Sequence, residues 1–254
     1  MRPDLSWLTA RPIAHRGLHD AAEGVIENSI SAARAAIASG FGVECDVQLT
    51  ADGELVVFHD ETLDRLTDGA GAVATRKAEE LKRLRLRGSN DAIPAFPDFL
   101  AAIGGRTPIV VEIKSAFDGD TTAALRAAQA LARYDGPVAI ESFDPDLIAF
   151  LRARAAALGI AHRPLGIVGE AQYSEADWPQ LSAAQRAELT HFLHYKRTLP
   201  DFLSWNVRDL PHAIPLLLRD ALGIPITAWT VRSLEIAAPA RDWTDQIVFE
   251  GFAP

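Results

Sequence analysis

Three acidic side chains stand on two predicted β-strands at a spacing that places them on one face. Glu44 and Asp46 are two residues apart in GVECDVQLT (42–50), and Glu112 precedes Lys114 by the same interval in PIVVEIK (108–114). Residues i and i+2 of a strand point to the same side of a sheet. Buried carboxylates repel one another unless they are paired or bind a metal ion. Such oxygen ligands predict one hard divalent cation, Mg2+ or Ca2+, held by Glu44, Asp46 and Glu112. The alternative is an ionic layer in which Lys114 and Arg16 neutralise the carboxylates.

Two histidines near these strands suit proton transfer. His15 ends the apolar run of PIAHRG, and His59 lies in LVVFHD, just after the second strand. Histidine titrates near neutral pH, so a pair is able to take a proton from a nucleophile and give one to a leaving oxygen. We predict that His15 and His59 are a general acid/base pair; each is alternatively a hydrogen-bonded core residue or a metal ligand. The other histidines show no such grouping and are expected in loops or at the surface: His19, His162, His191, His194 and His212.

Two cations at the same strand ends suit an anionic substrate. Arg16 has a planar fork that matches two phosphate oxygens, and Lys114 supplies a point charge for an oxyanion. Each has a structural alternative: Arg16 pairs with Asp20 or Glu27, and Lys114 pairs with Glu112. We predict that Arg16 and Lys114 bind the substrate.

Two aromatic residues end later strands and offer flat apolar walls. Phe143 closes PVAIESF (137–143), and Trp229 lies in PITAWTV (225–231). We predict that both contact the substrate. The alternative, packing in the core, is about equally common for large aromatic residues.

The elements that must position these residues alternate between short apolar runs and Ala-rich helical stretches. Eight strands separated by helices in 254 residues predict an α/β fold, the (β/α)8 barrel, whose active site lies at the carboxyl ends of the strands. A doubly wound open sheet is the alternative, but no Gly-rich phosphate fingerprint follows the first strand. The predicted strands are 11–15, 42–50, 108–114, 137–143, 164–168, 202–207, 225–231 and 246–251.

The second strand is predicted to continue into a hairpin. Only ADGE separates VECDVQLT from LVVFHD, which is too short for a parallel crossover, and Asp52-Gly53 suits a tight turn. Folding the chain there places His59 roughly opposite Asp46. The stretch of about 60–107 is then an insertion within a single domain, 1–254. A helix is expected to begin at Asn28 or Ser29, and prolines weaken the helix predictions for PHAIPLLLRDALG and SLEIAAPARDW.

The composition of the chain limits the binding partners and the cell compartment that are expected for it. The chain is 48% hydrophobic and 23% charged, with a formal net charge of −9, which disfavours a nucleic-acid-binding protein. An anionic small substrate must therefore meet local positive charge. No apolar run is long enough to cross a bilayer, and the first residues lack the order of a secretory signal. With Cys45 as its single cysteine, the chain is expected in the cytoplasm.

The chain resembles the glycerophosphodiester phosphodiesterase family from residue 12 to about 231. The matching segments are AHRG, IENSISAARAAIASG, VECDVQLTADGELVVFHDETLDRLTDGAG, IPAFPDFL, VVEIK, ESFDPDLI and AWTV. The resemblance implies a (β/α)8 barrel with a small insertion after the second strand. It implies a divalent metal ion at Glu44, Asp46 and Glu112, and His15 and His59 as the acid/base pair. It also implies Arg16 and Lys114 near the phosphate, and Trp229 on the glycerol side.

The last strand and its flanks depart from the family pattern. Ile26 replaces a frequent proline, Arg232 follows AWTV where asparagine is common, and Glu250 stands near the usual aspartate. These changes leave the metal and histidine positions intact. The expected activity is metal-dependent hydrolysis of a small glycerophosphodiester to sn-glycerol 3-phosphate and an alcohol. The alternatives are a lysophospholipase D-like or cyclising phosphodiester lyase with the same site, and a catalytically silent protein that binds a phosphodiester or metal.

Overall fold

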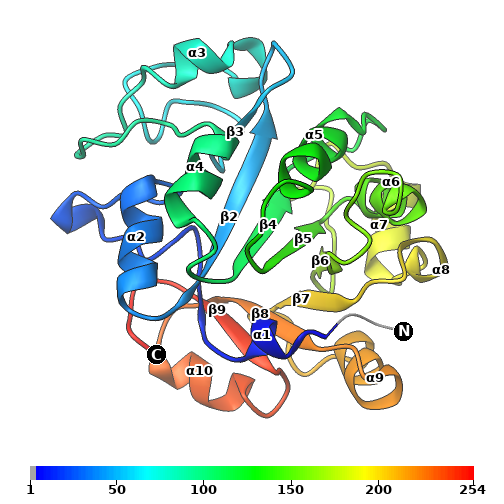
Figure 1. Cartoon of the computed structure of the whole chain (residues 1–254). Helices are drawn as coiled ribbons and strands as arrows, with labels where there is room; N and C mark the ends of the chain where they lie inside the picture. Colours follow the sequence, from blue (N-terminus) through cyan, green and yellow to red (C-terminus); the bar gives the residue numbers. More distant parts are fainter. Residues whose placement is uncertain (1–3) are drawn as a thin grey trace.

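A computed structural model describes residues 4–254, in which eight parallel strands close into a barrel (Figure 1). The strands follow the order β1-β9-β8-β7-β6-β5-β4-β2, and β1 pairs with β2 to close the ring. The predicted (β/α)8 barrel is confirmed. Its strands are β1 (Ile13–Ala14), β2 (Gly42–Leu49), β4 (Ile109–Ile113), β5 (Val138–Ser142), β6 (Leu165–Gly169), β7 (Phe202–Asn206), β8 (Ile226–Val231) and β9 (Gln246–Phe249).

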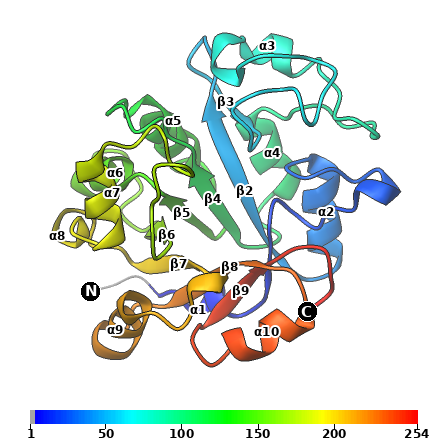
Figure 2. The ribbon, with the colours of Figure 1, turned by 180° about the vertical axis from the view of Figure 1, so that it is seen from behind.

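Helices surround the strands in both views (Figures 1 and 2). Both helices predicted weakly because of a proline do form. Pro215 lies in the first helical turn, where the missing amide hydrogen has no partner to lose, and Pro239 lies near the end of the last helix. The helices are α1 (Ser6–Thr9), α2 (Ile30–Ala38), α3 (Ala78–Leu81), α4 (Phe96–Ile103), α5 (Thr122–Leu131), α6 (Pro145–Arg154), α7 (Ala183–Thr190), α8 (Tyr195–Thr198), α9 (Ala213–Leu222) and α10 (Leu234–Ala240). Within residues 4–254, none of them is both long and apolar enough to span a bilayer.

The alternation of β2 decides which side chains reach the site. Val43, Cys45 and Val47 are buried in the large core between the strands and the helices. The intervening Glu44 and Asp46 therefore point to the other face of the strand, into the barrel. A single residue slip in register would exchange the two sets, so the apolar contacts of the outer face hold the acidic pair inside.

The amino end of the barrel is closed by packed apolar side chains. Leu8 of α1 joins Ile13, Val110 and Phe202 in one buried cluster. The Phe202 ring fills the space over Gly166, where a Cβ atom would lie 2.4 Å from it. Glycine is therefore required at this position of β6. With this end filled, the opposite end, at the carboxyl ends of the strands, is the open mouth.

The predicted hairpin after β2 is present. β3 (Leu55–Val57) pairs antiparallel with β2, and the Phe58 amide donates to the Asp46 carbonyl oxygen at 3.0 Å, so His59 follows one residue beyond. The next segment, which includes α3, projects beside the barrel (Figure 2) and has its own small core around Leu63, Val73 and Leu86. Residues 96–103, inside the stretch expected as an insertion, instead form α4 and join the main core.

Candidate functional site

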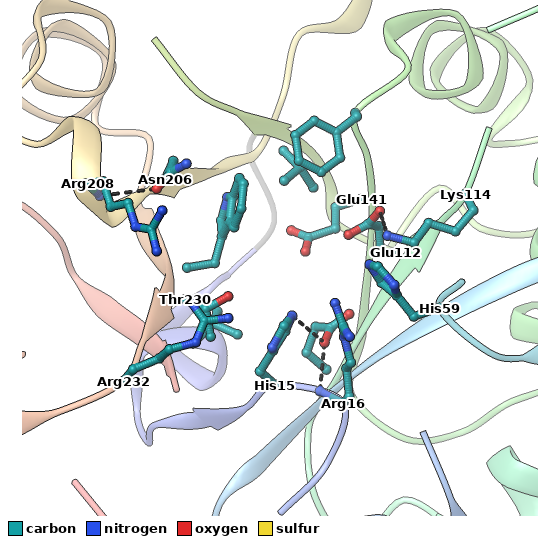
Figure 3. Close-up of a pocket in the computed structure, with 15 residues that line it drawn as sticks. His15, Arg16, His59, Glu112, Lys114, Glu141, Asn206, Arg208, Thr230 and Arg232 are labelled. Atoms are coloured by element: carbon teal, nitrogen blue, oxygen red, sulfur yellow. Dashed lines mark hydrogen bonds and ion pairs between the residues drawn. The ribbon is translucent and has the colours of Figure 1, made fainter. Parts of the chain in front are cut away.

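The carboxyl ends of the strands surround a pocket of about 330 Å³ at the barrel mouth (Figure 3). Every predicted site residue lines it except Asp46, which is buried and forms ion pairs with the lining residues Arg16 and Lys114. The predicted set is therefore brought together in one place. The lining residues are His15, Arg16, Glu44, His59, Glu112, Lys114, Glu141, Phe143, Val168, Asn206, Arg208, Trp229, Thr230, Arg232 and Val248.

Glu44, Asp46 and Glu112 form a compact buried cluster. One carboxylate oxygen from each lies within 4.8 Å of the other two. Their exposed fractions are 2%, 1% and 9%. Burial raises the pKa of Glu44 well above its usual range, and the charges of Asp46 and Glu112 add to this. Glu44 Oε1 is buried without a hydrogen-bond partner among residues 4–254. A divalent cation supplies the charge and the ligand contact that this oxygen lacks, so the donor set fits Mg2+ or Ca2+.

Asp46 is the most heavily bonded member of the cluster. The Asn28 side chain donates to Asp46 Oδ2 at 2.8 Å and accepts from the Asp46 amide at 3.1 Å. Lys114 Nζ lies 2.9 Å from Oδ1, and Arg16 Nε lies 3.4 Å from Oδ2. Burial alone would raise the pKa of Asp46, but Lys114 and the other nearby cations bring it well below its usual range. Asp46 is therefore ionised throughout the neutral range.

Asn28 is not the helix cap that the sequence allowed. Ser29 caps α2 by accepting from the Ala32 amide, whereas Asn28 has a φ of 57° and turns its side chain to Asp46. Asparagine tolerates this left-handed conformation better than most residues. The residue thus holds Asp46 in place. The only sequence signal was an asparagine directly before an equally good cap, Ser29.

Lys114 and Arg16 make the ion pairs expected as their structural alternatives. Lys114 Nζ lies 2.7 Å from Glu112 Oε1, and Arg16 Nη1 lies 2.7 Å from Glu27 Oε1. Burial would lower the pKa of Lys114, but Asp46 and Glu112 outweigh it and raise the pKa above its usual range. Both cations nevertheless line the pocket. Their ion pairs fix the position of the charge that they present there.

His15 is held by a carboxylate from the last strand. Its Nδ1 lies 2.6 Å from Glu250 Oε2, and its Nε2 lies 3.9 Å from Glu44 Oε2. An ionised carboxylate only accepts, so Nδ1 carries the hydrogen and the lone pair stays on Nε2. Burial lowers the pKa of His15, which favours this neutral form. Arg232 Nε donates to the other oxygen of Glu250 at 2.6 Å. Burial raises the pKa of Glu250, but the bond to His15 and the nearby cations bring it well below its usual range.

His59 has a second, more exposed carboxylate partner. Its Nδ1 lies 2.9 Å from Asp60 Oδ1, and 32% of its side chain is exposed. Arg65 Nε donates to Asp60 Oδ2 at 2.6 Å, and its terminal nitrogens donate to both oxygens of Glu27. Because Glu27 also accepts from Arg16, a continuous chain of ion pairs joins Arg16 to His59 through Arg65.

Glu141 is a third acidic residue that lines the pocket, and sequence reasoning assigned it no role. It is buried on β5 beside Glu112 in register and accepts from the Ser204 hydroxyl. Burial raises the pKa of Glu141 to about 8, with Glu112 and Asp46 adding to the effect. Its place at the end of a predicted strand was the one sequence feature that indicated a role in the site. Its neighbours Glu112 and Ser204 are both distant from it in sequence.

The aromatic residues are split between the pocket and the loop after β6. The Phe143 and Trp229 rings lie 5.4 Å apart at their centroids, and both line the pocket. Phe143 also contacts the Trp178 ring at 5.0 Å, and Trp229 Nε1 donates to the Ser204 carbonyl oxygen at 3.1 Å. Packing and pocket lining are therefore combined in the same two side chains.

Two of the histidines expected in loops or at the surface do lie in loops, but each makes contacts there. His194 is buried, with 1% of its surface exposed, and its ring contacts Phe192. Its burial follows from the loop between α7 and α8, which folds back so that Nδ1 lies 3.3 Å from Thr198 Oγ1. His19 Nε2 lies 3.9 Å from Glu250 Oε2, so this residue stands beside the carboxylate that holds His15. Neither contact is visible in local sequence.

Two known proteins with similar sequences are named glycerophosphodiester phosphodiesterases. A glycerophosphodiester phosphodiesterase from Caldanaerobacter subterraneus is 42% identical over 111 residues, which cover 41% of this chain and 44% of that relative. Glycerophosphodiester phosphodiesterase 1 from Bos taurus is 29% identical over 245 residues, covering 88% of this chain and 72% of that relative. The match thus spans less than half of the length of the bacterial relative.

Solved structures share the fold, and a family model matches most of the chain. An Oleispira antarctica phosphodiesterase in complex with the product sn-glycerol-3-phosphate superposes with a TM-score of 0.74 at 22% identity, over 96% of this chain and 94% of that one. The model of the "Glycerophosphoryl diester phosphodiesterase family" matches residues 15–247. This match contains both histidines, both cations and the whole acidic cluster, and the chain belongs to the glycerophosphoryl diester phosphodiesterase family.

Proposed function

We propose that this protein hydrolyses glycerophosphodiesters to sn-glycerol 3-phosphate and an alcohol, with a divalent cation at Glu44, Asp46 and Glu112. One observation carries the proposal: His15 Nε2, the ring nitrogen left unprotonated, lies 3.9 Å from Glu44 Oε2, beside a buried cluster that fits a cation. A protein that only binds a phosphodiester needs no such proton carrier at its metal site. The names of the relatives, and the product bound by the Oleispira antarctica protein, support the same substrate class.

The residues of the site have two roles in this reaction: some stabilise the charge of the phosphate, and others transfer protons. A cation held by the three carboxylates would polarise a phosphoryl oxygen and acidify a hydroxyl at the site. Arg16 and Lys114 place positive charge against the remaining phosphate oxygens. His15 Nε2 is free to take or deliver a proton, because Glu250 occupies Nδ1. His59 is arranged in the same way by Asp60, so one histidine serves the nucleophile and the other the leaving alkoxide.

The lining favours a hydrophilic diester over a lysophospholipid. Eleven of the fifteen lining residues are polar or charged, and the apolar ones are Phe143, Val168, Trp229 and Val248. A pocket of about 330 Å³ with this lining suits a head group rather than an acyl chain. The cytoplasmic location predicted from the sequence is part of the same proposal.

The direct test measures glycerol 3-phosphate release. The purified protein is incubated with glycerophosphocholine, glycerophosphoethanolamine, glycerophosphoglycerol and a lysophospholipid, each with Mg2+, Ca2+ or a chelator. We expect cation-dependent release from the hydrophilic diesters. Phosphorus NMR of the same mixtures reveals whether a cyclic phosphate forms, which separates attack by the substrate hydroxyl from attack by water. No product from any diester with any cation would refute the proposal.

The histidine assignment has its own test. His15→Ala and His59→Ala are expected to abolish turnover while circular dichroism shows an unchanged fold, because neither ring is part of the main apolar core. His162→Ala, on an exposed loop, is the matched control and should retain full activity. Normal activity in His59→Ala would contradict the acid/base pair.

A further inference from the structure

Arg208 presents a guanidinium to the pocket that no carboxylate of the described chain neutralises. It lines the pocket and is exposed, and it forms no ion pair with any other residue of the segment 4–254. Its backbone is firmly placed: Asn206 Oδ1 accepts from the Arg208 amide at 3.1 Å and begins the 3-10 helix Val207–Asp209. Asp209 Oδ2 accepts from the Ala171 amide at 2.8 Å, which fastens the same turn to the end of β6.

Arg232 directly follows β8, the strand next to β7, and lines the same pocket. Figure 3 shows the two guanidinium groups on one side of the pocket, across from Glu112 and Lys114. Arg232 uses its Nε for Glu250, and 52% of its side chain is exposed. Two further carboxylates near this side have other partners: Glu170 accepts from the Trp178 and Asn206 side chains, and Asp209 accepts from the Ala171 amide. This side of the mouth therefore carries cationic groups that its own carboxylates do not saturate.

Arg208 and Arg232 follow strands that lie across the barrel from β2 and β4, which carry most of the charges that the phosphodiester requires. In the ring order of the barrel, β7 is opposite β2 and β8 is opposite β4. The phosphate of a substrate is served by Arg16, Lys114 and the cation site, all on β1, β2 and β4. Arg208 and Arg232 thus face whatever part of the substrate extends across the mouth. Glycerol carries no charge, so only the alcohol group of a glycerophosphodiester is able to match them.

We infer that the enzyme prefers glycerophosphodiesters whose alcohol carries a further oxyanion, a carboxylate or a phosphate monoester, and that Arg208 with the terminal nitrogens of Arg232 binds this group. The guanidinium fork matches both oxyanions with paired hydrogen bonds. The inference rests on the proposed diesterase activity and adds the charge of the head group. A trimethylammonium head group would meet two cations there and is disfavoured by the same geometry.

The test compares two matched pairs of substrates. Glycerophosphoserine differs from glycerophosphoethanolamine by one carboxylate, and glycerophosphoinositol 4-phosphate differs from glycerophosphoinositol by one phosphate. We expect kcat/KM to be about tenfold or more higher for the anionic member of at least one pair, as charge-assisted hydrogen bonds allow. Which pair responds distinguishes the carboxylate from the phosphate monoester.

Arg208→Gln should abolish this preference by raising KM for the anionic member, while kcat/KM for glycerophosphoinositol, whose head group is uncharged, stays within about twofold. Arg208→Lys keeps the charge and loses the planar fork. Its preference for the anionic substrate should lie between those of the wild-type protein and Arg208→Gln. Arg133→Gln is the control, because Arg133 is exposed on the segment between α5 and β5, at the other end of the barrel. Equal rates within both pairs, or an equal loss on all four substrates in Arg208→Gln, overturns this inference and leaves the diesterase activity standing. No hydrolysis of any of the four overturns both.

Discussion

The two sides of the barrel mouth differ in whether their charged side chains are paired. On the side of β2 and β4, the charged groups are buried and bonded to one another, as in the contacts of Asp46 with Lys114 and Arg16. On the side of β7 and β8, Arg232 has one carboxylate partner and Arg208 has none within residues 4–254. The first arrangement holds groups to a narrow geometry, as bond-making requires. The second leaves cations free to meet a part of the substrate that varies.

The largest effect is expected on the buried side, from Glu44→Gln. The change removes a ligand charge, and we expect catalysis to fall by about a thousandfold, because a cation contributes several kcal/mol to stabilising the transition state. Calorimetric titration with Mg2+ and Ca2+ should show weakened binding. In the metal-free protein the same change removes the cost of burying this carboxylate and its repulsion by Asp46 and Glu112, which together raise the pKa of Glu44, so the thermal stability should increase.

The stability measurement distinguishes a cation site from an ionic layer. If Lys114 and Arg16 alone neutralised the cluster, Glu44→Gln would remove a stabilising charge and lower the melting temperature of the metal-free protein. Unchanged cation affinity together with a lower melting temperature would contradict the metal site and favour the ionic layer.

Glu250 bonds to His15 and to Arg232, which belong to the two different sides of the mouth. Its replacement therefore tests whether catalysis depends on both contacts. Glu250→Gln removes the charge that holds the His15 hydrogen on Nδ1, and we expect kcat to fall by about 10- to 100-fold, as for other partners of functional histidines. The assay uses glycerophosphoethanolamine, whose alcohol carries no oxyanion. Arg232→Gln removes the arginine partner of the same carboxylate and should cost no more than about threefold on this substrate. An equal loss in both variants would show that His15 depends on the cationic side as well.

A smaller effect is expected from Arg65, which links Glu27 to Asp60 at the outer edge of the buried side. Arg65→Ala leaves His59 held by an Asp60 without its second cation, and we expect kcat/KM to fall by about three- to tenfold, since partly exposed ion pairs contribute modestly. Arg65→Lys should recover part of this loss. Arg76→Ala, which breaks an exposed pair with Glu80, is the matched control and should leave activity unchanged. A loss as large as that of His59→Ala would place Arg65 in the chemistry itself.

The features of the fold and site that could be predicted from the sequence are those with a local signal. The barrel and the acidic cluster were predictable because their signals are local: period-two alternation in GVECDVQLT sets the inward face of β2, and parallel strands bring such faces together. The hairpin that brings His59 to the mouth follows from a short turn. Each of these needs only a few neighbouring residues.

The partners that position these residues were not predictable in the same way. Asn28 reads locally as a cap, and its bond to Asp46 depends on a backbone turn with positive φ. Glu250 reaches His15 across 235 positions of sequence, so only closure of the barrel brings them together. The Arg208 guanidinium forms no ion pair within residues 4–254, and a lone arginine after a strand carries no pattern. Long-range contacts and unpaired charges leave no local signal.

His194 does not line the pocket, so its titration affects the pH dependence of stability without changing the pH dependence of catalysis. Burial lowers the pKa of His194 to about 4, against 6.5 for the unperturbed residue. As the pH falls below 6.5, the unfolded chain binds a proton that the folded chain does not take up until about pH 4. The free energy of unfolding therefore decreases over this interval, by about 3 kcal/mol from this residue alone.

His194→Gln removes that titration without touching the pocket. Urea unfolding at pH 7 and at pH 4.5 gives the loss of stability on acidification for each protein, and the loss should be smaller in the variant. Because the comparison is made within each protein, a constant cost of the substitution at both pH values cancels. Activity at pH 7 should be unchanged, which makes this the smallest of the expected effects on catalysis. An identical acid loss in both proteins would mean that the folded chain already protonates His194 near pH 6.5, and burial without a charged partner would then not suffice to keep it neutral.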